Sequence, residues 1–123
     1  MVNEDFINVK TLVANFLVGN ANSVGLVADV GSVQGGQVLT SSFNVIDTSG
    51  TAGNAVTLPS SFNKGTVIFI KNGAAANSID VFPALGDDLG AGANTAVALA
   101  AGKGIAYIGT TADTTWEPLF TGA

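Results

Sequence analysis

Apolar and polar positions alternate over most of the chain after its first 22 residues, and this pattern predicts short strands. The run 67–70, Val-Ile-Phe-Ile, is rich in the β-branched and aromatic residues that suit a packed sheet. Val67 and Phe69 point to one face of this strand, and Ile68 and Ile70 point to the other. Keeping one large side chain from water contributes roughly 1.5–3 kcal/mol, so both faces need cover. We expect a second layer or a second subunit to supply it, and we place Ile68 and Ile70 among the candidate partner-binding residues.

The residues after this run predict a β-hairpin. Asn72 and Gly73 both tolerate positive φ, which is typical of a turn. The next segment, 79–83, alternates again, with Ile79 and Val81 on the same face. We therefore expect the strands at 67–72 and 79–83 to pair through a loop wider than a two-residue turn.

Further strand patterns predict an all-β fold. In the first of them, Val24 and Leu26 are expected to share one face with Ala28 and Val30. The other strand patterns lie at 37–46, 55–58, 97–99, 105–108 and 114–120. Short strands separated by Gly- and Asp-rich turns are typical of an antiparallel sandwich or a small barrel.

The first 22 residues follow a different pattern, so we divide the chain into an arm at 1–22 and a β-domain at 23–123. Apolar residues recur at intervals of three and four, which favours a short amphipathic helix. They are Phe6, Val9, Val13 and Phe16. Because β-branched residues are frequent in this segment, an extended arm is the alternative. We count these four apolar residues as candidate partner contacts.

The composition argues against several classes of function. The 123 residues include no histidine, cysteine or arginine, and the net charge is −5. A chain with this charge would repel a phosphate backbone, so we expect no binding to nucleic acid. Only 11% of the residues are charged, against about 25% in an ordinary soluble domain, while 47% are hydrophobic. Either the β-domain has a neutral surface or partners cover much of it, and the two interpretations are compatible.

The chain shows no pattern of membrane insertion or export. No apolar run approaches the ~20 residues of a membrane helix, and the start Met-Val-Asn-Glu-Asp lacks a basic region. We therefore expect no membrane partner, and a protein made in the cytoplasm.

Three short motifs imitate nucleotide-binding or acylating sites without completing them. Ser61 and Lys64 have the Ser-x-x-Lys spacing of serine β-lactam enzymes, but their companion motifs are missing. The glycines at 90–92 begin a dinucleotide-binding pattern in which Thr95 replaces the third glycine. The pair at 102–103 lacks the serine or threonine of a phosphate-binding loop. We predict no catalytic or cofactor-binding residue, and hence no enzyme and no cofactor.

Acidic and aromatic residues offer weaker candidates. Asp87 and Asp88, with Asp80, have the oxygen ligands that Ca²⁺ prefers, but adjacent aspartates in a Gly-rich segment are usually turn formers. We therefore predict no metal site. Tyr107 and Trp116 suit either a sugar-stacking platform or core packing, and the sequence favours the core for Trp116.

A string of strand and turn residues resembles a family of small tailed-phage virion proteins, β-rich capsid decoration or head-fibre subunits. The resemblance covers about 37–119 and rests on Val56-Thr-Leu-Pro59, 65–72, 79–83, Gly86-Asp87, Leu99-Ala-Ala-Gly-Lys103 and Trp116. It carries over no functional residue, and Leu58-Pro59 and Gly86-Asp87 look architectural. It implies a structural protein, commonly a homotrimer on the capsid exterior.

These observations lead to two expected functions. The first is a capsid decoration (cement) subunit that binds the major capsid protein on the outside of the virion and stabilises the head after assembly in the host cytoplasm. The alternative is a tail or head-fibre domain that binds host surface glycans, with Tyr107 or Trp116 in an exposed aromatic patch. A small hydrolase using Asp87 and Asp88 is the weakest candidate.

Overall fold

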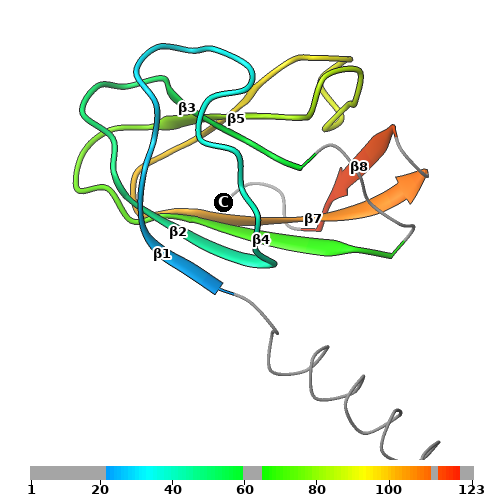
Figure 1. The fold of residues 1–123 in the computed structure, drawn as a ribbon, viewed down its shortest axis with the longest axis horizontal. Helices are drawn as coiled ribbons and strands as arrows, with labels where there is room; N and C mark the ends of the chain where they lie inside the picture. Colours follow the sequence, from blue (N-terminus) through cyan, green and yellow to red (C-terminus); the bar gives the residue numbers. More distant parts are fainter. Residues whose placement is uncertain (1–21, 60–64, 112–113, 120–123) are drawn as a thin grey trace, which may run out of the picture.

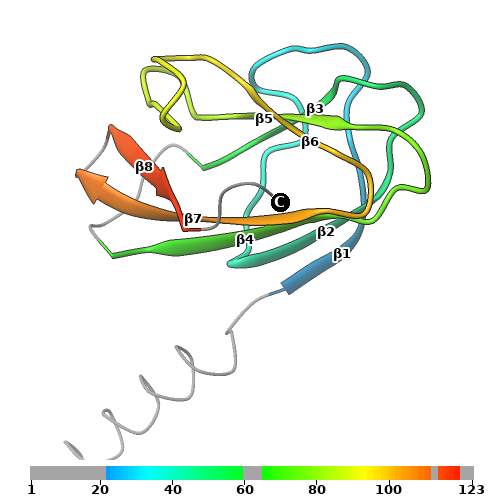
Figure 2. The ribbon, with the colours of Figure 1, turned by 180° about the vertical axis from the view of Figure 1, so that it is seen from behind.

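The computed structural model describes residues 22–59, 65–111 and 114–119. In this part the chain forms strands and no helix, which confirms the all-β prediction. The strands are β1 (Asn22–Val27), β2 (Phe43–Thr48), β3 (Asn54–Thr57), β4 (Val67–Asn72), β5 (Ile79–Phe82), β6 (Val97–Leu99), β7 (Gly104–Thr111) and β8 (Thr115–Pro118). They build two layers that face each other (Figures 1 and 2).

Both sheets are mixed rather than antiparallel. The larger sheet has the order β1-β2-β4-β7-β8, and the smaller one has the order β3-β5-β6. The pairs β1–β2, β2–β4 and β3–β5 are parallel, whereas β4–β7, β7–β8 and β5–β6 are antiparallel. Of the two predicted architectures, an antiparallel sandwich or a small barrel, the structure has the sandwich, and the predicted antiparallel pairing holds for only three of its six strand pairs.

The parallel pairs β2–β4 and β3–β5 arise because the chain changes layer after each of three successive strands. β2 and β4 lie in the larger sheet, and β3 and β5 lie in the smaller one. The predicted hairpin between β4 and β5 is therefore wrong, because its two strands belong to different sheets. Gly73 marks the departure from β4: its N–H donates to the carbonyl oxygen of Ile46 at 2.7 Å. A Cβ added to Gly73 would lie 3.3 Å from that oxygen, so glycine permits the close approach.

A bulge in β1 changes which side chains face the core. Ser23 pairs with Asn44 and Leu26 pairs with Ile46. Between these two pairs, β1 therefore contains one residue more than β2 does. Gly25 adopts φ = 72°, a conformation that glycine reaches without strain. As a result Val24 is 69% exposed while Leu26 packs against the core, and the prediction that they share a face is wrong.

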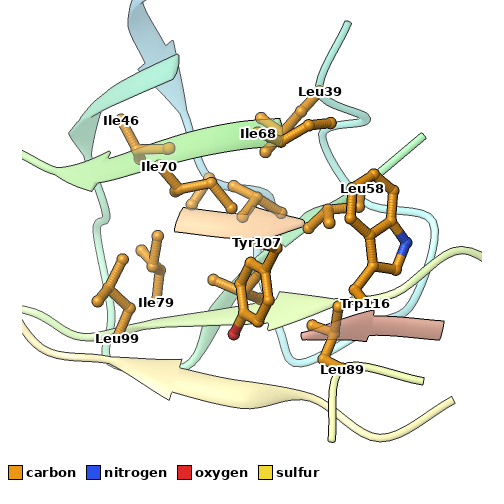
Figure 3. Packing of buried hydrophobic residues seen from close by; sticks show 13 residues of the cluster. Leu39, Ile46, Leu58, Ile68, Ile70, Ile79, Leu89, Leu99, Tyr107 and Trp116 are labelled. Carbon is orange, nitrogen blue, oxygen red and sulfur yellow. The ribbon is translucent and has the colours of Figure 1, made fainter. Parts of the chain in front are cut away.

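The core lies between the two sheets (Figure 3). Each sheet contributes large aliphatic side chains, and the larger sheet adds two aromatic rings. The members that are at most 5% exposed include Leu39, Ile46, Leu58, Ile68, Ile70, Ile79, Val81, Leu89, Leu99, Tyr107 and Trp116. The prediction that Trp116 packs in the core is confirmed, since it is fully buried.

A buried amide joins the two layers. The Nδ2 of Asn72, at the end of β4, donates to the carbonyl oxygens of Asn77 and Leu99, both at 3.0 Å. Its Oδ1 accepts from the N–H of Ala74 at 3.1 Å. Leu99 belongs to β6 in the smaller sheet, so this side chain links the sheets directly. Asn72 therefore has a structural role between the layers and not the hairpin turn that the sequence predicted.

The described residues contain no helix long and apolar enough to cross a membrane. The predicted arm, with Phe6, Val9, Val13 and Phe16, lies outside these residues except for its last one. The same holds for Ser61 and Lys64.

Candidate interaction surfaces

The outer face of the larger sheet, turned away from the smaller sheet, carries exposed aromatic side chains. Phe43 of β2 and Phe69 of β4 are register partners, and their rings lie 6.0 Å apart with a 33° tilt. The two side chains remain 44% and 41% exposed. Half-buried Val45 and Val67 lie next to them along the same strands. We call Phe43, Val45, Val67 and Phe69 the outer face.

Ile68 and Ile70, which the sequence assigned to a partner contact, lie on the opposite side of β4. They are 4% and 2% exposed and belong to the core between the sheets. Their register partners on the neighbouring strand β7 are Tyr107 and Ile105. The expected second layer exists, and the chain's own smaller sheet provides it. This burial corrects the assignment of Ile68 and Ile70 to a partner contact, because Phe69 and Val67 are the β4 residues that face outward.

A second apolar surface lies beside the smaller sheet. A groove of about 340 Å³ is lined by Gln34, Gly35, Val38, Thr57, Leu58, Ala84 and Leu85. Leu85 is 85% exposed and Val38 is 46% exposed. Val30 and Val33, on the loop that leads into the groove, are 87% and 59% exposed. We call Val30, Val33, Val38 and Leu85 the loop surface.

Hydrogen bonds fix the two loops that form the loop surface. The Nε2 of Gln34 donates to the carbonyl oxygen of Pro83 at 2.9 Å and to Oδ1 of Asn94 at 3.1 Å. The N–H of Gly35 donates to Oγ1 of Thr57 at 2.9 Å, which ties the first loop to β3. The loop surface is thus held in place before any partner binds, which lowers the ordering cost of association.

The acidic residues serve the turns of the chain. Oδ1 of Asp88 accepts from the N–H groups of Gly90 and Gly92 at 2.6 and 2.9 Å, so its role as a turn former is confirmed. Asp87 is 3% exposed, and Asp80 accepts a hydrogen bond from the Ser32 hydroxyl. Among the described residues, no three acidic side chains gather where they could hold a metal ion.

The glycine motifs at 90–92 and 102–103 occupy turns. Gly90 and Gly92 adopt φ = 96° and 111° in the turn held by Asp88, which does not open a helix. Gly102, at φ = 77°, lies in the tight connection between β6 and β7. Neither motif therefore has the strand-to-helix context of a phosphate-binding loop.

The two aromatic residues proposed for a sugar platform are both buried. Tyr107 is 1% exposed and Trp116 is fully buried, so the expected exposed patch at these positions is wrong. Burial raises the pKa of Tyr107 from 10.0 to about 12, because the charged phenolate would lose its hydration. The exposed aromatic pair of the described chain is Phe43 and Phe69 instead.

Neither the family models nor the curated proteins compared with this chain match it.

The sequence missed both surfaces for a common reason. Phe43 and Leu85 sit in stretches that look like ordinary strand and turn, and exposure depends on which layer covers them. One signal was present: Val67 and Phe69 make the second face of β4 apolar. A two-layer sandwich covers only one face of each sheet, so one apolar face of β4 had to remain outside.

Proposed function

We propose that this chain is a structural subunit of a tailed-phage virion, a capsid decoration (cement) protein that binds the outer surface of the head. The observation that carries the proposal is the groove of the loop surface, where Val38 and Leu85, 46% and 85% exposed, line one apolar hollow between hydrogen-bonded loops. Contiguous exposed apolar side chains mark protein interaction sites more often than isolated ones do. The resemblance to small virion proteins supplies the class of partner, the major capsid protein.

Charge and composition support an outer position. The net charge of −5 disfavours contact with the packaged genome. The absence of histidine and cysteine from the sequence removes the commonest general base and nucleophile, which favours a structural role over catalysis. A homotrimer would place three loop surfaces on one shell, so that three weak contacts give strong attachment. In this way the subunit would bridge neighbouring capsid proteins and stabilise the head.

The test is binding of the purified chain to empty expanded heads of the phage that encodes it. Substituting Leu85→Ser and Val38→Ser removes apolar area that the shell would cover. The expected loss is about 2–3 kcal/mol, or roughly 30- to 150-fold in affinity for one subunit. The control is Val24→Ser, which changes an exposed valine on β1, away from the groove. Unchanged binding by the folded double variant would remove the loop surface from the proposal.

The fibre function remains the alternative because Phe43 and Phe69 form an exposed aromatic pair on which a sugar ring could stack. It predicts glycan binding that is lost in Phe69→Ser without unfolding. Copy number separates the two functions, since a fibre is present in about a dozen copies and a decoration protein in hundreds.

A further inference from the structure

Asn72 and Gly73 form the one Asn-Gly step in the sequence, and this dipeptide is the one most prone to deamidation. In this reaction the backbone nitrogen of the following residue attacks Cγ of the asparagine. A succinimide ring forms, Nδ2 leaves as ammonia, and water then opens the ring to give aspartate or isoaspartate. Glycine hinders the attack least, because it has no Cβ and lets the backbone turn freely. The local sequence therefore marks Asn72 as a modification site.

The folded chain holds the attacking nitrogen away from this reaction. The attack requires the nitrogen of Gly73 to lose its proton and the bond between Cα and the carbonyl carbon of Asn72 to rotate. The N–H of Gly73 is engaged, since it donates to the carbonyl oxygen of Ile46 at 2.7 Å. The carbonyl oxygen of Asn72 accepts from the N–H of Gly102 at 2.8 Å, and its N–H donates to the carbonyl oxygen of Lys103 at 2.9 Å. Rotation would break these bonds on both sides of the peptide group.

The side-chain amide of Asn72 is held just as firmly. Nδ2, the leaving group, donates to the carbonyl oxygens of Asn77 and Leu99, both at 3.0 Å. Oδ1 accepts from the N–H of Ala74 at 3.1 Å, which fixes the orientation of Cγ. Asn72 is fully buried, so water does not reach Cγ to open a succinimide. Because these bonds join β4 to the smaller sheet, releasing the amide requires the two layers to separate.

We propose that Asn72 is a deamidation site that the fold protects and that global unfolding exposes. The product does not fit the fold. An aspartate at this position faces the carbonyl oxygens of Asn77 and Leu99 with a carboxylate, and a buried charge among acceptors is strongly unfavourable. Isoaspartate lengthens the main chain by one methylene at the point where Gly73 meets Ile46. Each unfolding event therefore leaves some chains unable to refold, and the lifetime of the protein depends on how often it unfolds.

Peptide mass spectrometry of the full chain tests this proposal, with samples held at mildly alkaline pH across a series of urea concentrations. We expect conversion at Asn72 to follow the unfolded fraction reported by Trp116, and to be at least about a thousandfold slower in the native state. Asn54 is the internal control, because it is also buried but precedes Ala55, so it should react more slowly in the unfolded chain. Gly73→Ala, measured in urea where the fold plays no part, should slow conversion at Asn72.

Three results would overturn the proposal. Conversion at Asn72 no faster than at Asn54 in the unfolded chain would remove the modification site. Native conversion that does not follow the unfolded fraction would show that the fold does not protect it. The third result concerns refolding: after dilution from urea, the lost part of the native Trp116 fluorescence should equal the converted fraction, and Asn72→Asp should lower the urea midpoint. An Asn72→Asp variant with the unchanged midpoint would show that the product fits the fold.

Discussion

Replacing Asn72 with alanine tests whether one buried amide holds the two sheets together. The substitution removes three hydrogen bonds at 3.0, 3.0 and 3.1 Å, to Asn77, Leu99 and Ala74. Asn72 is fully buried, so its backbone partners lose the amide that satisfies them. Each buried polar group left unsatisfied costs about 1–3 kcal/mol. Taking the lower end for three groups, we expect a loss of about 3 kcal/mol in the free energy of unfolding.

This loss is large against the 5–15 kcal/mol that stabilises a typical domain. For a chain of this size it corresponds to roughly 10–20 °C in the melting temperature. Urea unfolding, followed by the fluorescence of Trp116, measures it directly, because Trp116 is the single tryptophan and is fully buried. The matched control is Asn77→Ala, which loses one side-chain hydrogen bond, to the carbonyl oxygen of Ser49. We expect about 1 kcal/mol for that variant. If Asn72→Ala costs no more than the control, the amide does not join the sheets.

Three further substitutions and conditions test the local account. Tyr107 has a folded pKa of about 12, against 10.0 unfolded, so its contribution is complete below pH 10 and is lost as the pH rises toward 12. Urea titrations at pH 9 and 11.5 should show a fall of up to about 2 kcal/mol, and Tyr107→Phe should remove that pH dependence. Gly25→Ala places a Cβ on a residue with φ = 72° and should lower the free energy of unfolding by about 1 kcal/mol. The control Gly50→Ala, where the added Cβ meets open space and φ is not positive, should lower it by less. Equal losses in the two variants would argue against the bulge. Asp88→Ala loses two backbone N–H partners and should cost about 1–2 kcal/mol by thermal melting; an unchanged melting temperature would contradict its role in the turn.

Local patterns predicted the strands well because strand formation depends on residues close together in sequence. The run at 67–70 became β4, the alternating segment at 79–83 contains β5, and Pro59 lies just beyond the end of β3. Pairing was harder, since it depends on which layer each strand joins. Asn72 and Gly73 have the composition of a hairpin turn, yet Asn72 lies between the sheets and Gly73 starts a crossing to the other layer.

The candidate surfaces depended on the same nonlocal information. Nothing near Phe69 in the sequence says that the smaller sheet covers Ile68 and not Phe69. Val24 shows how a single inserted residue decides whether a side chain is exposed. Val24 is two residues before Leu26 and would share its face in a regular strand, but the bulge at Gly25 turns Val24 outward. Leu85 lies in a short turn. Because the alternation of a strand does not apply there, the sequence does not predict whether its side chain is buried or exposed.

The most direct test of the proposed function is the number of copies of this chain in purified virions, measured by quantitative mass spectrometry against the major capsid protein. A decoration subunit predicts hundreds of copies for each particle, lost together when emptied heads are stripped and restored by adding the purified chain. About a dozen copies, or none on the head, would contradict the proposal.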